Sequence, residues 1–270
     1  SCGTSRATVA RDVRALVTSQ RTRPFGGCRR DNRDVGSGPL AGMHVDVLVY
    51  DGFDELDGIG PYEVFDYALT YAGDSAAEEA AASDAADAAT AGGSDTAGRV
   101  RYVTLDARET VTASHGTQVG VDGTLPGPDG DDAPDLLVVP GGGWNGRDEE
   151  ASAWAEAQRG DVPDALAAHH AAGTRIASVC TGSMLLAEAG VTDGRRAVTH
   201  AAAIDELRAS GARVVDARVV DDGDLLTAGG VTSGIDLALY VVETAFGEAI
   251  ADRVATVIEY EPRHAVASPE

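Results

Sequence analysis

Short apolar runs that alternate with helical patterns constrain the fold of this chain more than any other feature. The runs HVDVLVY, DLLVV and TRIASV each have the length of one buried strand, and segments of helical spacing follow them. Parallel strands need a crossover connection, which is usually a helix. The alternation therefore predicts an α/β fold, a mainly parallel sheet covered by helices on both faces.

Three glycine-bearing turns follow strands of this expected sheet: YDGFDELDG, VPGGG and SVCTGS. Ligands of open parallel sheets bind outside the carboxyl ends of the strands. We therefore expect the three turns to converge in one crevice. Helices are expected after Pro61 and in the segments ending at Gly173, Gly190 and Gly247, because Pro favours a first turn and Gly ends a helix.

Cys180 lies where the strand IASV turns into the helix TGSMLLAEAG. A sharp strand-to-helix turn projects its corner side chain outward, provided that small residues surround it, as Ser178, Gly182 and Ser183 do. A helix N-terminus favours an anion and lowers a thiol's pKa. The position thus predicts a reactive thiolate nucleophile. The alternative is a buried cysteine that acts as a small apolar residue.

The turn PGGG offers backbone N–H groups at Gly141, Gly142 and Gly143. Together with the N–H of Thr181 these groups would stabilise an anionic intermediate. Alternatively, the glycines only let the chain leave the strand. A phosphate cradle is a third option, but neither GxGxxG nor a P-loop with Lys is present. Three cysteines without CxxC spacing argue against a zinc site, so we expect no metal and no cofactor.

The distribution of composition divides the chain into three parts. Residues 1–42 are basic and lack an apolar face, so we expect a disordered or non-native extension, with a basic nucleic-acid-binding arm as the alternative. Residues 43–262 form the expected domain, interrupted at 73–98 by an insertion of Ala, Asp, Glu, Ser, Thr and Gly, expected to be disordered or loosely helical. Residues 263–270 are expected to be a flexible tail.

The chain carries a net charge of −23, with 21 Arg, no Lys and 44 acidic residues. Such a charge repels nucleic acid and anionic membranes, and a dense carboxylate surface is typical of proteins from salt-loving cells. A GC-rich genome is the other explanation for Arg without Lys. No run of 18 apolar residues and no signal-peptide pattern occur, which predicts a cytoplasmic protein.

Six ordered motifs resemble the DJ-1/PfpI superfamily, from about Met43 to Pro262: VYDGFDELDGIGPYEVF, LLVVPGGG, SVCTGSMLLAEAG, AVTHAAAIDEL, DGDLLTAGGVTSGIDLAL and RVATVIEYEP. The resemblance implies a flavodoxin-like three-layer sandwich of the class I glutamine amidotransferase type. The isonitrile hydratase branch is the most similar, which implies a lyase that adds water to an isonitrile and gives an N-substituted formamide. Relatives are usually dimers, so a homodimer is expected.

The resemblance also implies roles for individual residues. The nucleophile of that branch matches Cys180, followed by Thr181, and its essential aspartate matches Asp57 in LDGIGP. Asp57 would act as a protonated partner of the thiolate. The alternative is that Asp57 caps a helix starting near Gly60 or Pro61. Gly60 and His200 are expected in the substrate pocket. Glu63 is the alternative carboxyl partner, and His115, His169 and His170 are expected in loops or facing solvent.

Two other functions fit the same residues. A DJ-1-like glyoxalase or deglycase would use Cys180 and a carboxyl group on reactive aldehydes such as methylglyoxal. A redox-sensing or stress-response protein would oxidise Cys180 without turnover. The proteolytic branch carries His after the cysteine, and Thr181 stands there instead. A small-molecule substrate is the expected partner in both enzymatic readings.

Overall fold

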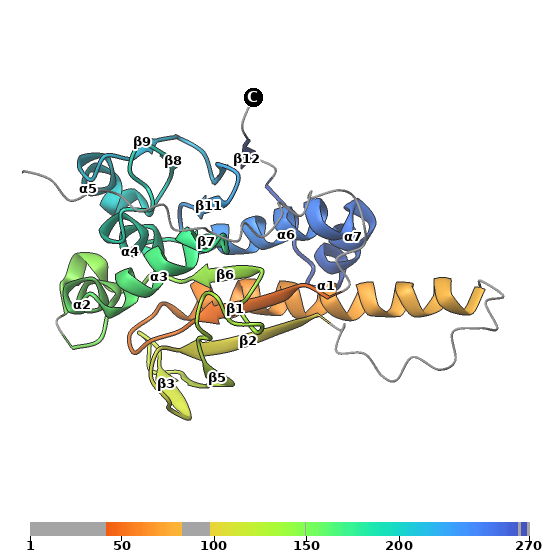
Figure 1. Ribbon diagram of the computed structural model, residues 1–270. Helices are drawn as coiled ribbons and strands as arrows, with labels where there is room; N and C mark the ends of the chain where they lie inside the picture. The colour runs from red at the N-terminus through yellow and green to blue at the C-terminus, as the bar shows by residue number, and fades with distance from the viewer. Residues whose placement is uncertain (1–41, 83–97, 149, 264–265, 269–270) are drawn as a thin grey trace, which may run out of the picture. The chain divides into compact units, whose positions relative to one another are not determined.

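The computed structural model describes residues 42–82, 98–148, 150–263 and 266–268 (Figure 1). The expected N-terminal extension, apart from Gly42, and the larger part of the acidic insertion lie outside these residues. The described residues all belong to one compact unit.

An eight-stranded sheet forms the centre of this unit. Its spatial order is β12 (Val266–Ala267), β10 (Val219–Asp221), β11 (Leu225–Ala228), β7 (Arg175–Val179), β6 (Leu136–Val139), β1 (His44–Leu48), β2 (Arg99–Thr104) and β5 (Gly123–Thr124). All neighbouring pairs are parallel except β10 and β11, which the turn after Asp221 joins as a hairpin. The predicted mainly parallel sheet is confirmed.

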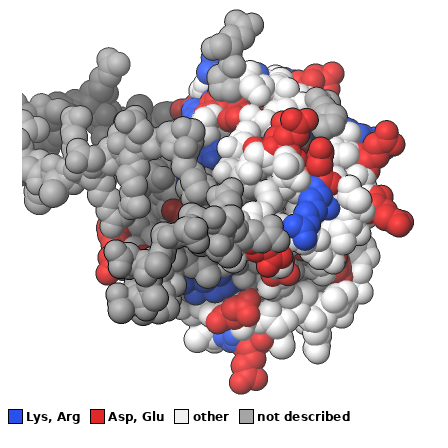
Figure 2. Space-filling model, turned by 90° about the vertical axis from the view of Figure 1, so that its right-hand side faces the viewer, with Lys and Arg blue, Asp and Glu red and all other residues white. Residues whose placement is uncertain are grey.

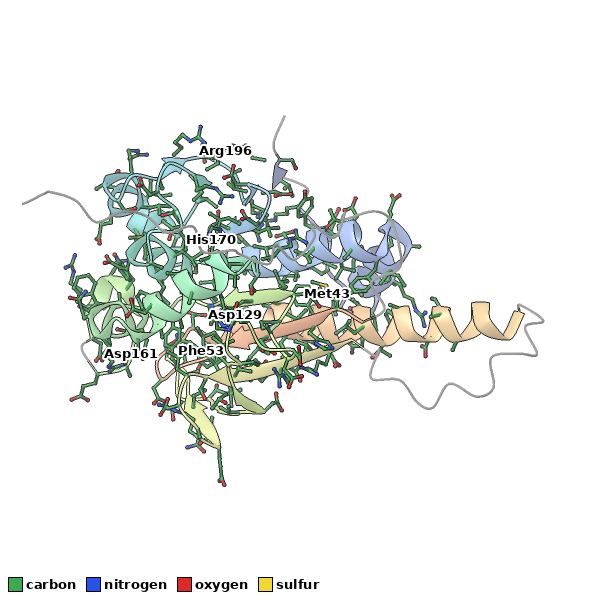
Figure 3. The ribbon with its side chains drawn as sticks, viewed as in Figure 1. Met43, Phe53, Asp129, Asp161, His170 and Arg196 are labelled. Atoms are coloured by element: carbon green, nitrogen blue, oxygen red, sulfur yellow. The ribbon has the colours of Figure 1, made fainter. Side chains whose placement is uncertain are left out.

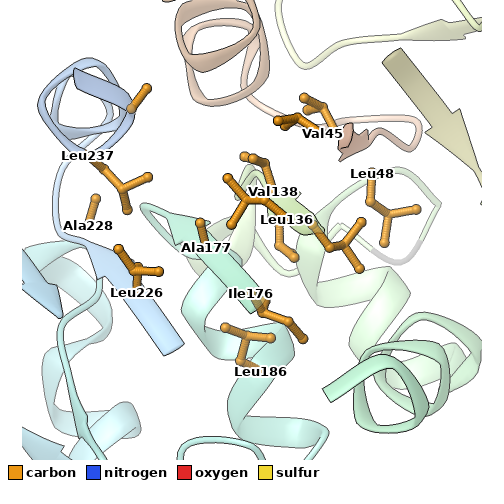
Figure 4. Packing of buried hydrophobic residues seen from close by; sticks show 14 of the residues in the cluster. Val45, Leu48, Leu136, Val138, Ile176, Ala177, Leu186, Leu226, Ala228 and Leu237 are labelled. Carbon is orange, nitrogen blue, oxygen red and sulfur yellow. The ribbon is translucent and has the colours of Figure 1, made fainter. Parts of the chain in front are cut away.

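The central strands are buried because helices cover both faces of the sheet, as their continuous apolar runs require. Every residue of β6 and β11 is buried, and Val138 lies opposite Val47 on β1 and Ala177 on β7. Figure 4 shows side chains of these strands packed against Leu186 and Leu237 of neighbouring helices. The two layers of apolar contacts on either side of the sheet form one continuous core.

The helices fall into two packed groups (Figure 1). One group consists of α1 (Glu55–Ala82), α6 (Ser233–Phe246) and α7 (Glu248–Val257). The other consists of α2 (Ala153–Arg159), α3 (Asp161–Ala171), α4 (Gly182–Glu188) and α5 (Ile204–Ala209). The three-layer arrangement that the motifs implied is therefore present.

Smaller elements complete the unit. A hairpin of β3 (Thr110–Thr112) and β4 (Gln118–Gly120) forms its own sheet, as does the pair β8 (Arg196–Ala197) and β9 (Arg213–Val214). Two 3₁₀ turns, η1 (Trp144–Gly146) and η2 (Ala201–Ala203), follow β6 and β8.

Two element boundaries differ from those expected. Helix α1 begins at Glu55 rather than after Pro61. It continues to Ala82, so the start of the expected insertion is helical, which is one of the two forms expected for it. The residues expected to be a flexible tail include β12, which pairs with β10 at the edge of the sheet. An edge strand offers unpaired N–H and C=O groups, which explains how a two-residue segment is held there.

Candidate active site

The three glycine-bearing turns meet at the carboxyl ends of β1, β6 and β7, which are neighbours in the sheet. Asp54, after β1, donates its N–H to the carbonyl of Gly141, after β6, at 2.8 Å. Gly142 donates its N–H to Oγ1 of Thr181, after β7, at 3.0 Å. Figure 3 shows Phe53 at this end of β1 and Met43 at the other. The three turns therefore lie together, as expected.

Cys180 stands at the corner between β7 and α4 with a φ of 57°. Its N–H donates to the carbonyl of Ala228 at 3.0 Å, and its carbonyl accepts from Oγ1 of Thr199 at 2.9 Å. Non-glycine residues seldom adopt such a φ, and they cluster at functional sites when they do. Both backbone groups of Cys180 are thus held by neighbouring strands and loops while its side chain is turned out of the strand.

Small residues around the corner make this conformation fit. Ser178 and Ser183 share a hydrogen bond of 2.7 Å between their hydroxyl groups, and Ser183 also donates to the carbonyl of Val198. A Cβ at Gly182 would overlap the carbonyl oxygen of Val139. The expectation that small residues surround Cys180 is confirmed, although the residue itself is only 6% exposed rather than openly accessible.

Asp57 lies in the first turn of α1 and is fully buried. Its Oδ2 accepts the N–H of Gly141 at 3.0 Å. Among the described residues no group meets the geometry of a full hydrogen bond to the buried Oδ1. The helix cap is Asp54, whose carboxylate accepts the N–H of Leu56 at 3.3 Å. Asp57 therefore does not serve as the cap, and one of its oxygens is unsatisfied.

Asp57 and Cys180 interact and alter each other's protonation. Burial raises the pKa of Asp57 well above its usual range, Asp54 raises it further, and contacts from Gly141 and Cys180 partly oppose this. Burial also raises the pKa of the Cys180 thiol, the charge of Asp57 adds to the rise, and the N–H of Thr181 opposes it. The expected lowered thiol pKa is wrong, because loss of solvent outweighs the N-terminus of the short helix α4.

The PGGG amides are used differently from what the sequence suggested. The N–H of Gly141 is bound to Asp57 and that of Gly142 to Thr181, so neither is free to stabilise an anion on a substrate. A Cβ at Gly141 would lie 2.5 Å from the nitrogen of Thr181, and Gly143 has a φ of 67°. These glycines are required by close backbone approach between the β6 and β7 turns and by the left-handed turn.

The remaining predicted residues are Gly60, His200 and Glu63. Gly60 is buried in α1, where a Cβ would lie 3.3 Å from Ile235 and 3.4 Å from Leu56. His200 follows Thr199, and its Nδ1 accepts the N–H of Ala202, so its hydrogen bond caps η2. Glu63 is exposed on α1, in contrast to the buried Asp57, which disfavours it as the carboxyl partner.

Of the other histidines, His115 is exposed, as expected. His169 is buried, contrary to expectation, with its ring nitrogens near Oγ1 of Thr174 and the carbonyl of Pro126. His170 is partly buried and pairs with Asp224 at 3.3 Å. In the described part of the chain no group of three or more His, Cys, Asp and Glu side chains is arranged to hold a metal ion.

Sequence reasoning missed two residues that touch the site. Thr199 binds the carbonyl of Cys180, and Tyr50 donates its hydroxyl to the carbonyl of Pro140 at 2.7 Å. Tyr50 comes two residues after β1, at the start of a turn that the sequence did single out. A buried phenol requires a partner, and that requirement was the available signal.

Comparison with known proteins agrees with this geometry. The DJ-1/PfpI family profile matches residues 43–244. Isonitrile hydratase of Pseudomonas putida is 38% identical over 157 residues, which cover 56% of this chain and 62% of that protein. A deglycase of Pyrococcus horikoshii is 31% identical over 130 residues, which cover 47% of this chain and 71% of that protein. The chain thus spans less than two thirds of the hydratase.

The fold is shared with solved structures. A ThiJ/PfpI family protein from Pseudomonas syringae superimposes with a TM-score of 0.63 at 24% identity, over 90% of this chain and 83% of that one. The family profile covers most of the sheet and both turns that carry the cysteine and the PGGG segment. The chain belongs to the DJ-1/PfpI family.

Proposed function

We propose that this protein hydrates small isonitriles to N-substituted formamides, with Cys180 as nucleophile and Asp57 as its proton-transfer partner. The similarity to an isonitrile hydratase supports the substrate class. The observation that carries the proposal is the buried carboxyl group of Asp57, which interacts with the Cys180 thiol and whose Oδ1 accepts no full hydrogen bond among the described residues. A carboxyl group with spare hydrogen-bonding capacity next to a thiol is suited to moving one proton between sulfur and a substrate atom.

In the first step the sulfur of Cys180 attacks the terminal carbon of the isonitrile. The thiol proton passes to Asp57 and then to that carbon, which forms a thioimidate, R–N=CH–S–Cys. The carbon–sulfur and carbon–hydrogen bonds form as one π bond of the carbon–nitrogen triple bond is used. Neither a cofactor nor a change in oxidation state of the protein is needed.

In the second step water adds to the thioimidate carbon. One water proton goes to nitrogen, the carbon–oxygen bond forms, and the carbon–sulfur bond breaks. The proton that remains on oxygen returns through Asp57 to sulfur, which leaves R–NH–CHO and the resting thiol. Asp57 accepts and donates a proton in both steps, as a general acid and base.

The pair is active when it holds a single proton. Burial raises both pKa values, so the pair holds a single proton in the pH range between the raised pKa of Asp57 and the raised pKa of Cys180. The N–H of Thr181 contacts the sulfur and favours the thiolate as it develops. The hydroxyl of Thr181 holds the PGGG turn through Gly142. Pocket roles for Gly60, Gly143 and His200 belong to this proposal.

The experiment is an assay of the full chain with cyclohexyl isonitrile, following formamide by chromatography. We expect Cys180→Ala to lose turnover and Asp57→Asn to lose at least about 100-fold, the range for one general acid–base group. Glu63→Gln, an exposed acid on the same helix, should retain full turnover. Full activity in Asp57→Asn would refute the role of the carboxyl group.

A deglycase or glyoxalase is the second candidate, because a deglycase is among the relatives. Methylglyoxal in the same assay tests it: aldehyde loss that depends on Cys180, without formamide production, would favour this function. Selective oxidation of Cys180 without turnover of either compound would favour a redox sensor. We further propose a homodimer, which light scattering during size-exclusion chromatography would test.

A further inference from the structure

Tyr50 is the least explained side chain at the candidate site. It is 5% exposed, and its ring meets Phe53 edge to face at 6.5 Å between centroids. Packing needs only a ring at this position, yet the hydroxyl donates to the carbonyl of Pro140 at 2.7 Å. The hydroxyl of Tyr50 takes no part in the steps of the proposed reaction.

The two hydrogen bonds around Tyr50 and Asp57 converge on one peptide group. The carbonyl of Pro140, which accepts from Tyr50, and the N–H of Gly141, which donates to Asp57, belong to the same peptide unit. A trans peptide is a rigid plane with its oxygen and hydrogen at opposite edges. Fixing the oxygen therefore fixes the direction of the N–H.

Without Tyr50, the oxygen edge of this plane would lose its hydrogen bond, and the N–H of Gly141 bound to Asp57 would hold the plane from the other edge alone. Rotation changes ψ of Pro140 and φ of Gly141, and glycine tolerates a wide range of φ. The next carbonyl, of Gly141, is held by the N–H of Asp54, so the Pro140–Gly141 plane can turn within an otherwise anchored loop. A rotation would remove from Asp57 the one full hydrogen bond that it accepts among the described residues.

We propose that Tyr50 is a positioning residue, whose hydroxyl holds the Pro140–Gly141 peptide with its N–H directed at Asp57 and so favours the carboxylate form of Asp57. It acts through the peptide and touches no reacting atom. The inference rests on the proposed pairing of Cys180 with Asp57. Its test, however, does not require turnover of any isonitrile.

The electrostatic surroundings agree with this role. Burial raises the pKa of Tyr50 well above its usual range, and the charges of Asp57, Glu156, Cys180 and Asp54 raise it further, so the phenol stays protonated and can only donate to the carbonyl. The N–H of Gly141 lowers the pKa of Asp57 against the effect of burial. Loss of that N–H would thus raise the pKa of Asp57.

The experiment measures the alkylation rate of Cys180 by iodoacetamide against pH, resolved by peptide mass spectrometry because the chain also contains Cys2 and Cys28. Protonation of Asp57 produces an inflection in this profile, since its charge suppresses the thiolate. In Tyr50→Phe we expect the inflection to move to higher pH by about one unit. Tyr50→3-fluorotyrosine, a stronger donor of nearly the same shape, should move it to lower pH.

Two controls separate positioning from a structural effect. Tyr240→Phe removes another phenol hydrogen bond of 2.7 Å, to Asp221, and should leave the inflection unchanged. In an Asp57→Asn background, Tyr50→Phe should change nothing further. An unmoved inflection in both Tyr50 variants, or an equal shift without Asp57, would overturn the proposal. Absence of isonitrile turnover, with the inflection moving as expected, would count against the proposed function alone.

Discussion

Cys180 holds a backbone conformation that costs about 1–3 kcal/mol for a residue with a side chain. Hydrogen bonds to Ala228 and from Thr199 hold both of its backbone groups in place. The strained corner brings the thiol beside Asp57, a carboxyl group that comes from a different strand's turn. The strain therefore maintains a contact on which the proposed chemistry depends.

Gly141→Ala tests the packing of the turns behind this contact. Its Cβ would lie 2.5 Å from the nitrogen and Oγ1 of Thr181, and backbone there cannot give way. We expect about 1–3 kcal/mol of lost stability, as for other overpacked sites, and loss of turnover as the N–H leaves Asp57. Gly120→Ala, where nothing lies within 4 Å of the added carbon, is the control. Equal unfolding free energies by denaturant titration would contradict the expectation.

The pH profile of turnover should be bell-shaped. Below the raised pKa of Asp57 the pair holds two protons and cannot accept the thiol proton. Above the raised pKa of Cys180 it holds none to give to the substrate carbon. We expect the acid limb above the ordinary aspartate value of 3.8 and the alkaline limb above the ordinary thiol value of 9.0. An alkaline limb near pH 6 would show that the thiol pKa is lowered instead.

At the scale of residues, the sequence predicted which side chains lie together better than it predicted their protonation states. Cys180 and Gly182 were found because a strand-to-helix corner demands a small residue two places after the cysteine. Asp57 was identified through the LDGIGP motif of the family resemblance. The direction of the thiol's pKa was missed because burial depends on what covers the site, and no local pattern encodes that.

At the scale of elements, the β3–β4 hairpin is fastened to the start of α1 by Glu55. Its carboxylate accepts the N–H groups of His115 and Thr117 and contacts the side chains of His115 and Ser114. The hairpin also donates the N–H of Ser114 to the carbonyl of Phe53. The loop that leads to Asp57 is thereby held between the sheet and the hairpin.

Glu55→Gln should loosen this hairpin. Partial burial acts to raise the pKa of Glu55, but hydrogen bonds from His115 and Thr117 outweigh it and lower the pKa from 4.5 to about 2. The carboxylate therefore stabilises the fold above pH 4.5, and this contribution is lost as the pH falls towards 2. We expect faster amide exchange at His115 and Thr117 in the variant, measured by NMR at pH 6.

Glu63→Gln, exposed on the same helix, is the matched control and should exchange as the parent does. Unchanged protection of the hairpin in Glu55→Gln would show that backbone hydrogen bonds alone hold it. In the parent, lowering the pH from 4.5 to 2 should reproduce the effect of the substitution.

Element types were largely predictable, and their ends were not. The buried strands could be predicted from apolar runs, because a strand that helices cover on both faces has apolar side chains on both faces. The start of α1 was misplaced because Pro61 suits a first turn, whereas the structure places it inside the helix. Because Pro61 has no N–H, the carbonyl of Asp57, four residues earlier, lacks its usual helical hydrogen bond. The helix nevertheless continues through this position near its N-terminus. The strand β12 has only two residues, too few for any periodic signal.

At the scale of the whole molecule, charge dominates the surface. Residues 43–270 carry 13 Arg and 41 acidic residues, and Figure 2 shows acidic side chains spread over one face with fewer Arg between them. Like charges at this density repel one another and favour expansion of the chain. Within the described residues, no helix has the length and apolarity needed to cross a lipid bilayer.

Salt should therefore stabilise the protein. Raising KCl from 0.1 to 1 M shortens the screening length from about 10 Å to about 3 Å and weakens the repulsion. We expect the thermal unfolding midpoint to rise with KCl, and to rise less in a variant with several exposed acids changed to Asn or Gln. A midpoint that falls or stays level would contradict the prediction of a salt-adapted protein.

The order of the strands has a practical consequence. The exposed loop between β5 and β6 separates β1, β2 and β5 from the five strands on the other side of the sheet. Cutting the chain in that loop would place Asp57 on one fragment and Cys180 on the other. If the chain has the proposed activity, turnover by the mixed fragments would then report their reassembly, as a split-enzyme sensor requires.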